Sequence, residues 1–275
     1  MLQRQDVIAA MSRQTQWWLG ERLAKLRDLK HETMAINPFM APLVVGLHSH
    51  VTFDELAELL LDSHLMGGHA TGFGKLVDEK ILPEVFKTIK LDKAFRRIMP
   101  YTLPVFTEID HIVSRGGERF LLSLKSSRWT IQLTMAKELN KSFKELLDLR
   151  QSRPDVKFSR LVVGVIYGTE ATLTDKFSII RGIRGRTDHN AFDIAEHVDV
   201  VAGRNLWAWL NEGELATQDW MMEGILDGRD KAAPALREAA RLRDGFKRNF
   251  TSQFVSYIDP TGKIDWQGIL RSING

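Results

Sequence analysis

The sequence predicts an α/β protein with a mixed β-sheet core flanked by helices, and a helical lobe contributed by both termini. Two β-rich segments, residues 106–115 and 119–127, enclose an Arg-Gly-Gly-Glu stretch that is typical of a hairpin turn. A short apolar run at 160–168 is typical of a strand buried within a sheet. Apolar residues recur with a helical period near both termini. The order of hairpin, helix and further strands favours a sheet of mixed direction.

The N-terminal region is predicted to be helical, with interruptions. A first helix covers residues 3–35, and a second begins at residue 54 and is expected to stop at Gly67-Gly68. These glycines are expected to open a glycine-rich loop. Residues 75–86 again have helical spacing, which Pro83 disturbs.

The remaining elements follow from the same patterns. Further strands are expected within 160–168, 176–183 and 198–203. Further helices are expected over 130–152, 205–213, 217–228 and 233–258. These assignments predict an N-terminal helical region (1–72), a catalytic core (73–210) and a C-terminal helical region (211–275). The C-terminal helices are expected to pack with the N-terminal ones and to form a dimer contact.

Composition limits the classes of function. The chain has no cysteine, which excludes disulfides and thiolate metal sites. A formal net charge of +3 permits a nucleic-acid partner without requiring one. No apolar run is long enough to cross a membrane, and the first residues are too polar for a signal peptide. We therefore expect a cytoplasmic protein without a membrane partner.

The chemistry-bearing residues lie on the predicted hairpin. Side chains alternate faces along a strand, so Ser123 and Lys125 share one face, and Glu108 and Asp110 share a face of the preceding strand. Pairing through the Gly116-Gly117 turn would bring a carboxylate and an ammonium group together. Such a cluster suits phosphodiester hydrolysis, in which carboxylates hold a divalent cation and a lysine readies a water. A plain cross-strand ion pair is the alternative interpretation.

A resemblance to a known family sharpens this hypothesis. The stretches AINPFM, HLMGGHATGFGKLVDEKILPEVF, EIDHIV, LLSLKSSRWTIQLTMAKELNK, VVGVIYG, LTDKFSIIRGI and SING resemble the type II restriction endonucleases that cut the palindrome RGGNCCY. The similarity covers residues 1–275. It implies a homodimer with a PD-(D/E)XK-type fold that uses Mg²⁺ to cut double-stranded DNA and leaves 5′-phosphates. It also implies that Asp110 and the Leu124 carbonyl bind the metal, while Lys125 activates the attacking water.

One position departs from the superfamily pattern, which has Asp or Glu two residues before the lysine. Ser123 stands there, and serine is a poor ligand for Mg²⁺. The related family also carries serine at this position, so Ser123 does not by itself indicate a dead enzyme. A second carboxylate would come from Glu79, Glu138 or Glu108. Glu79 is preferred because its apolar neighbours suggest that it is partly enclosed.

Three segments are candidates for DNA contact. The first is rich in arginine and could read guanines; it contributes Arg181, Arg184, Arg186, His189 and Asn190. The second follows the catalytic lysine and could hold phosphates or cap the next helix; it contributes Ser126, Ser127 and Arg128. The third is Lys75, after the glycine-rich stretch, which could touch the DNA backbone. Nucleotide binding there is rejected because Leu76 replaces the Ser or Thr of a phosphate-binding loop.

Two alternatives remain open. The chain could be a repair or recombination nuclease that recognises DNA structure rather than sequence. It could also be a DNA-binding protein with a degenerate nuclease core, a hypothesis that Ser123 favours.

Overall fold

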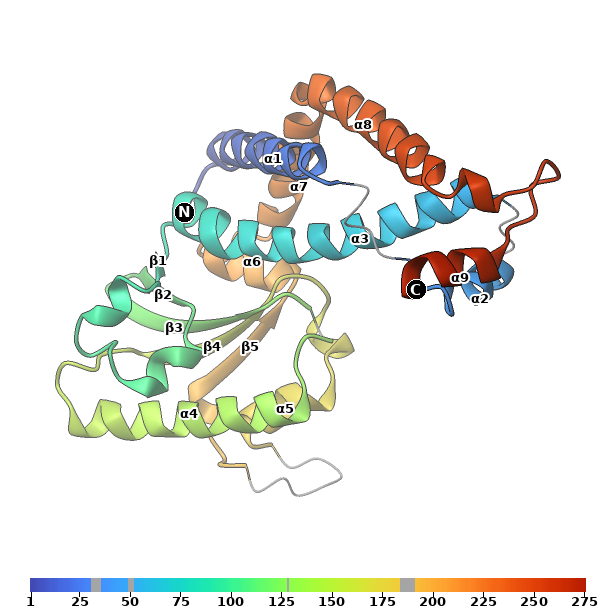
Figure 1. The fold of residues 1–275 in the computed structure, drawn as a ribbon. Helices are drawn as coiled ribbons and strands as arrows, with labels where there is room; N and C mark the ends of the chain where they lie inside the picture. The colour runs from blue at the N-terminus through green and yellow to red at the C-terminus, as the bar shows by residue number, and fades with distance from the viewer. Residues whose placement is uncertain (31–35, 49–51, 128, 184–190) are drawn as a thin grey trace. The chain divides into compact units, whose positions relative to one another are not determined.

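The chain folds into two compact units (Figure 1). The computed structural model describes residues 1–30, 36–48, 52–127, 129–183 and 191–275. One unit contains residues 1–14 and 74–227, and we call it the sheet unit. The other contains residues 15–73 and 228–275, and we call it the helical unit. Residues 1–14 and the segment up to 227 thus belong with the sheet, beyond the predicted core limits of 73 and 210.

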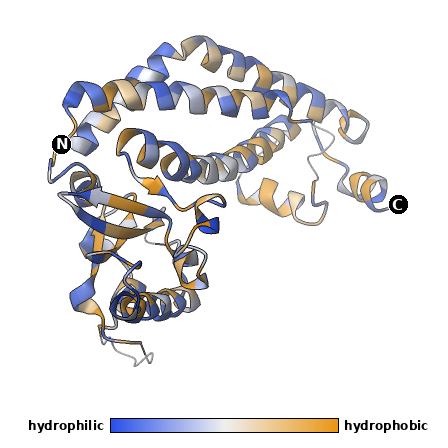
Figure 2. Ribbon diagram, turned by 90° about the vertical axis from the view of Figure 1, so that its left-hand side faces the viewer, coloured by the Kyte–Doolittle hydropathy of each residue, from blue (hydrophilic) through white to orange (hydrophobic). Residues whose placement is uncertain are grey.

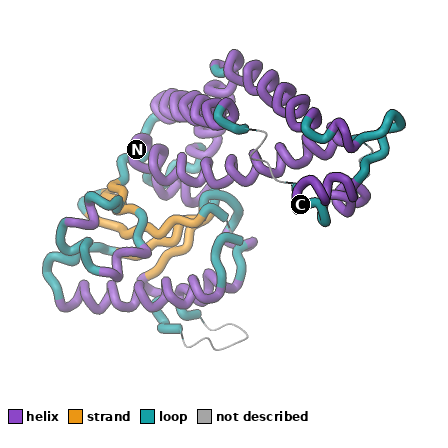
Figure 3. Tube along the Cα trace, viewed as in Figure 1, coloured by secondary structure: helices purple, strands orange, loops and turns teal. Residues whose placement is uncertain are grey.

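The sheet unit is built on five strands in the order β1-β2-β3-β4-β5 (Figure 3). The strands are β1 (Ile89–Lys90), β2 (His111–Arg115), β3 (Glu118–Lys125), β4 (Arg160–Val165) and β5 (Val198–Ala202). β1, β2 and β3 pair antiparallel, whereas β3, β4 and β5 pair parallel. The predicted α/β class with a mixed sheet is therefore confirmed.

Helices cover both faces of this sheet (Figure 1). α4 (Leu133–Ser152) and α5 (Asp175–Arg181) lie against one face, and α6 (Arg204–Leu210) lies against the other. Leu121 of β3 belongs to the hydrophobic core formed with α4. The next residue, Leu122, lies beside Leu206 of α6, and both surround Gly164. β3 is therefore buried on both faces, and Figure 2 shows hydrophobic residues along the strands.

Shorter elements complete the sheet unit. They are η2 (Val77–Val85), η3 (Phe95–Arg97), η4 (Pro104–Glu108), η5 (Glu170–Thr172) and η6 (Ala195–His197). The helix α7 (Thr217–Lys231) belongs to the sheet unit up to residue 227, and its last residues belong to the helical unit. η2 is a π-helix with Pro83 inside it. The wider π turn accommodates a residue that cannot donate a backbone hydrogen bond.

The helical unit joins helices from both ends of the chain, as predicted. α1 (Arg4–Arg27) and α3 (Phe53–Leu76) each extend into it, together with α2 (Ala41–Leu47), α8 (Ala233–Ser252), η7 (Val255–Tyr257) and α9 (Trp266–Asn274). Phe53 lies 6.0 Å from the ring of Phe250, which stacks in turn on Phe246. Arg27 of α1 forms an ion pair with Glu238 of α8. No helix within the described ranges is long and apolar enough to cross a membrane.

Four predictions about elements are wrong, and the first concerns residues 176–183. They form α5 rather than a strand. The apolar run is too short for its period to separate the two structures. Asp175 lies in the first turn, Arg181 in the last, and Gly182 ends the helix with a φ of 71°.

The other three errors concern where a helix or strand begins or ends. α3 continues through Gly67-Gly68 to Leu76, so the expected glycine-rich loop is helical. Residues 104–108 form η4, so Glu108 does not share a strand face with Asp110. The predicted helix over 233–258 ends at Ser252, and α9 follows, starting where the Asp265 side chain accepts a hydrogen bond from the Gly268 N–H.

Candidate active site

The predicted site lies at the edge of the sheet where β3 ends and β2 begins. Because these strands are antiparallel, Asp110, directly before β2, lies beside the last residues of β3. The Leu124 N–H donates to Asp110 Oδ2 at 2.6 Å, and the Asp110 N–H donates to the Leu122 carbonyl at 2.9 Å. The sheet thus brings Asp110 next to the Ser123-Leu124-Lys125 segment, as the hairpin pattern predicts.

The Asp110 carboxylate is held in a desolvated position. Burial raises the pKa of Asp110, and the Leu124 N–H and the positive charge of Lys125 oppose this rise without cancelling it. Lys125 is therefore near enough to act on Asp110. Within the described part of the chain, however, Lys125 forms no ion pair shorter than 4.0 Å. The Lys125 ammonium group therefore forms no cross-strand ion pair with Asp110.

A second carboxylate, that of Asp78 in η2, interacts with the same site. Its negative charge contributes to the raised pKa of Asp110. Asp78 Oδ1 lies 2.8 Å from His111 Nε2, and Asp78 Oδ2 lies 2.5 Å from Lys90 Nζ. Burial alone would raise the pKa of Asp78, but the hydrogen bonds from His111 and Lys90 outweigh it, so the pKa lies below its ordinary value.

His111 is fully buried and is fixed on both ring nitrogens. Because a carboxylate only accepts hydrogen bonds, Nε2 carries the proton that is donated to Asp78. Nδ1 lies 2.9 Å from the Thr88 hydroxyl, which can donate to it when the ring is neutral. This chain of contacts holds Asp78 against the start of β2, the strand that carries Asp110 to the site.

Arg96 fixes the backbone that leads to Asp110. Its guanidinium donates to the carbonyls of Leu91, Phe106, Thr107 and Ile109, at 2.8, 2.6, 3.3 and 2.9 Å. The Leu91 N–H in turn donates to the Asp110 carbonyl at 2.8 Å. A single side chain therefore joins the end of β1 to η4 and sets the position from which Asp110 projects.

The two residues around Leu124 have different environments. Ser123 is 0% exposed, and its hydroxyl has no hydrogen-bond partner. By strand alternation it shares the α4 side of the sheet with Leu121. Lys125, two residues further, is only half-buried. The structure thus presents Lys125 at the edge and encloses Ser123 in the core.

The preferred second acid, Glu79, is not the one beside Asp110. Its side chain is 52% exposed and its nearest cation is Lys90 at 3.8 Å. Glu138 is exposed on α4, and Glu108 lies in η4. The sequence holds one local signal for Asp78: it precedes the buried residues Ile81 and Leu82 by three and four positions, a helical spacing that indicates a partly enclosed side chain but not its contacts.

The predicted DNA contacts are only partly described. Arg128, Arg184, Arg186, His189 and Asn190 lie outside the described residues. Lys75 is exposed in the last turn of α3, and Ser126 is half-buried directly after Lys125. The buried Ser127 hydroxyl accepts a hydrogen bond from the Trp129 N–H within the turn. Arg181, at the end of α5, points its guanidinium toward the Ala195 carbonyl. Ser127 and Arg181 are therefore engaged in local structure.

The site offers a magnesium ion few ligands, and they are of a suitable kind. Among the described residues, no group of three or more His, Asp or Glu side chains could hold a metal. Asp78 has both oxygens occupied, whereas Asp110 Oδ1 has no hydrogen-bond partner in the described chain. Leu124 lies two residues beyond Leu122, the last β3 residue that pairs with β2. The C=O and N–H of one strand residue point to the same side, so the Leu124 carbonyl points toward the side on which its N–H meets Asp110. One carboxylate and one carbonyl suit Mg²⁺, which is usually completed by water and substrate phosphate.

Comparisons with protein-family models and with curated proteins found no match to this chain.

Proposed function

We propose that this protein is a Mg²⁺-dependent type II restriction endonuclease that hydrolyses double-stranded DNA at a GC-rich palindrome, RGGNCCY or a close variant, and leaves 5′-phosphates. The observation that supports it most is the position of Asp110 beside Leu124 and Lys125, where β2 begins and β3 ends. Asp110 is held by the Leu124 N–H at 2.6 Å, beside a lysine that has no ion-pair partner in the described chain. A desolvated carboxylate beside a free ammonium group at a sheet edge suits phosphodiester hydrolysis.

The residues that would hold Mg²⁺ are Asp110, through its free Oδ1, and the Leu124 carbonyl. When bound, the ion would supply positive charge to the scissile phosphate and the leaving oxygen. Asp78 is better placed than Glu79 to influence this site, because its charge acts on Asp110. We therefore replace Glu79 by Asp78 as the second acid of the proposal.

The chain's own residues would then divide the remaining work. Lys125 would orient a water molecule toward phosphorus and stabilise the negative charge that develops there. Lys90 and His111 would keep Asp78 ionised through their hydrogen bonds, which lower its pKa. Ser126 and Lys75 remain candidates for phosphate contact because both reach the surface.

A second candidate function has one observation in its favour. Ser123 replaces the usual acid, and the described residues bring no three metal-binding side chains together. A DNA-binding protein with a degenerate nuclease core would show the same features. This candidate predicts DNA binding without cleavage.

Digestion of a supercoiled plasmid of known sequence separates these functions. The purified protein with Mg²⁺ should produce discrete fragments whose sequenced ends share one palindrome. Lys125→Ala should slow cleavage by about 10²–10⁴-fold, the range for loss of a group that assists proton transfer. Lys141→Ala is a matched control, since this lysine is 72% exposed on α4. The control should cut like the wild type.

Two results would redirect the proposal, and a third would overturn its active site. DNA binding without cleavage in any divalent cation would favour the degenerate nuclease. Cleavage of branched or damaged DNA, with intact plasmid untouched, would favour a structure-specific nuclease. Unchanged cleavage by Lys125→Ala would remove the basis for the active site.

A further inference from the structure

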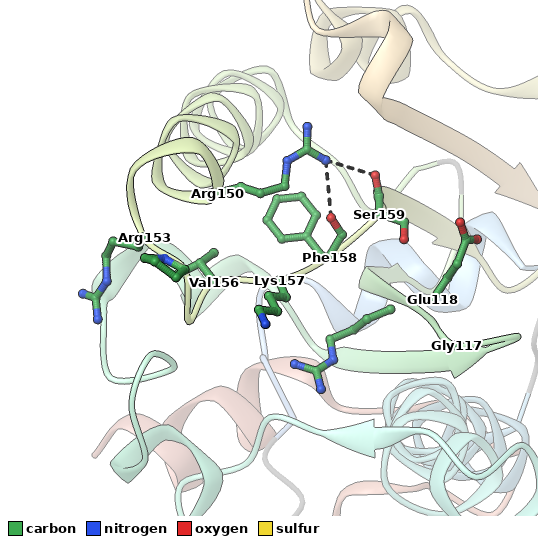
Figure 4. Close-up of a pocket in the computed structure, with 10 residues that line it drawn as sticks. Gly117, Glu118, Arg150, Arg153, Val156, Lys157, Phe158 and Ser159 are labelled. Carbon is green, nitrogen blue, oxygen red and sulfur yellow. Dashed lines mark hydrogen bonds between the residues drawn. The ribbon is translucent and has the colours of Figure 1, made fainter.

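A cavity of about 560 Å³ opens beside the turn between β2 and β3 (Figure 4). It is lined by the turn residue Gly117, the first residues of β3, the end of α4 and the segment 153–159 that leads into β4. Glu118 and Lys125 are the two ends of β3. At a rise of about 3.3 Å per residue, the cavity lies roughly 20 Å from Lys125 along this strand. It is a separate site.

Positive charge is concentrated around this cavity. Four cations line it, namely Arg119, Arg150, Arg153 and Lys157, against one acid, Glu118. The lining therefore carries a formal charge of +3, equal to that of the whole chain. Arg153 is neutralised by Asp155, but within the described residues Arg119 and Lys157 form no ion pair. Arg119 only approaches the Tyr101 hydroxyl, at 3.4 Å.

Arg150 forms a fixed wall of the cavity. One terminal nitrogen donates to the carbonyls of Phe158 and Ser159, at 3.4 and 3.1 Å (Figure 4). The guanidinium also lies over the Phe158 ring, 5.0 Å from its centroid. These contacts use part of its five N–H donors and hold the planar group in place. Ser159 is tied to β3 by a hydrogen bond from its N–H to the Arg119 carbonyl at 2.6 Å.

We propose that this cavity binds a phosphate group carried by a ligand of about the size of one nucleotide. A fixed arginine, a second arginine and a lysine without ion pairs match the several acceptor oxygens of a phosphate. The volume falls in the range of sites for small organic ligands and far exceeds a single oxyanion. The phosphate could belong to a free nucleotide or to the backbone of DNA, and the chemistry of recognition is the same.

The test measures binding by the 275-residue chain without Mg²⁺, so that the DNA probe is not cleaved during the measurement. The probes are inorganic phosphate, a 5′-nucleoside monophosphate, and a short DNA duplex that lacks any GC-rich palindrome. The cavity variant is Arg119→Gln/Lys157→Gln, in which both side chains are exposed. The control, Lys137→Gln/Lys141→Gln, removes the same charge from the exposed face of α4.

The cavity variant should weaken binding by about tenfold or more, and the control by less than about twofold. Loss of nucleotide binding identifies a free nucleotide as the source of the phosphate, and loss confined to the duplex identifies the DNA backbone. Absence of binding to all three probes overturns the proposal, as does equal weakening in both variants. Both variants should unfold like the wild type. The outcome does not depend on DNA cleavage, so either proposal can fail alone.

Discussion

At the scale of single residues, the site contains two carboxylates whose environments shift their pKa values in opposite directions. Asp110 has a raised pKa because it is buried, whereas Asp78 has a lowered pKa because His111 and Lys90 outweigh its burial. A raised carboxyl pKa means that ionisation destabilises the folded state as the pH rises through that pKa. A lowered pKa means that ionisation stabilises the folded state, and this stabilisation is lost as the pH falls through it.

Isosteric amides should therefore change stability in opposite directions. At neutral pH, Asp110→Asn should raise the free energy of unfolding, because the amide oxygen can still accept from Leu124 and no buried charge remains. Asp78→Asn should lower it by about 1–3 kcal/mol, the usual effect of losing a hydrogen bond to a charged group. Urea unfolding at several pH values measures both. The Asp78→Asn difference should be full above the ordinary aspartate pKa of 3.8 and should shrink as the pH falls from there through the lowered pKa of Asp78. If both variants changed the free energy of unfolding in the same direction, the opposite pKa shifts of Asp110 and Asp78 would be contradicted.

The hydroxyl of Ser123 provides a second test at this scale. A buried hydroxyl without a partner costs about 1–3 kcal/mol, which exceeds the small packing loss of removing one oxygen. Ser123→Ala should therefore unfold at an equal or higher urea concentration than the wild type. Cleavage should stay within a few-fold, since Ser123 is sealed from solvent. A large loss of cleavage with unchanged stability would show that Ser123 takes part in the reaction.

The sequence predicts the pair Asp110 and Lys125 because strand alternation and a glycine turn fix their register. Gly116 and Gly117 have φ angles of 58° and 80°, as a two-residue hairpin turn with positive φ at both central residues requires. Arg115 pairs with Glu118 across this turn, as expected. Asp78 was missed because its importance depends on His111 and Lys90, residues 33 and 12 positions away in the chain. No local pattern encodes these long-range contacts.

At the scale of elements, the start of β2 depends on Arg96. Its guanidinium donates hydrogen bonds to one carbonyl directly after β1 and to three carbonyls in the segment that precedes Asp110. Loss of this side chain would leave these acceptors without partners. Arg96→Gln should reduce cleavage by more than the loss of folded protein explains. It should also shift the acid limb of the pH–rate profile, because the environment of Asp110 changes. Arg96→Lys should restore part of the activity.

Arg97 is the matched control for this prediction, because it is exposed on the same short helix. Arg97→Gln should cut DNA at the wild-type rate with an unshifted pH profile. If Arg96→Gln lowers only the amount of folded protein and leaves the profile unchanged, its role is structural and it does not position Asp110.

Errors at the scale of elements have local causes. The segment 176–183 was predicted as a strand from its apolar residues, yet its ends carry helix signals: Asp175, Arg181 and the left-handed Gly182. Gly67-Gly68 looked like a helix end, but the helix continues because buried residues on either side of the glycines, such as Leu61 and Leu76, hold α3 in place. Two interior glycines cost about 1 kcal/mol each relative to alanine, which tertiary packing can offset.

At the scale of the whole molecule, the proposed function requires two copies of the chain. A palindromic DNA site has twofold symmetry, and a homodimer presents one Asp110–Lys125 site to each strand. Each subunit would then cut one strand independently. The assembly can be tested through its product, without knowledge of which helices form the dimer contact.

Mixed dimers should cut only one strand. Wild-type protein should be unfolded and refolded together with a large excess of Lys125→Ala, so that most active subunits acquire an inactive partner. Plasmid DNA should then accumulate as nicked circles, because the inactive subunit leaves its strand intact. Refolding with Lys141→Ala instead should give linear DNA, since this exposed lysine on α4 has no part in the site. Linear product at the rate expected from wild-type subunits alone, with no nicked intermediate, would show that one chain cuts both strands, and the twofold arrangement would be wrong.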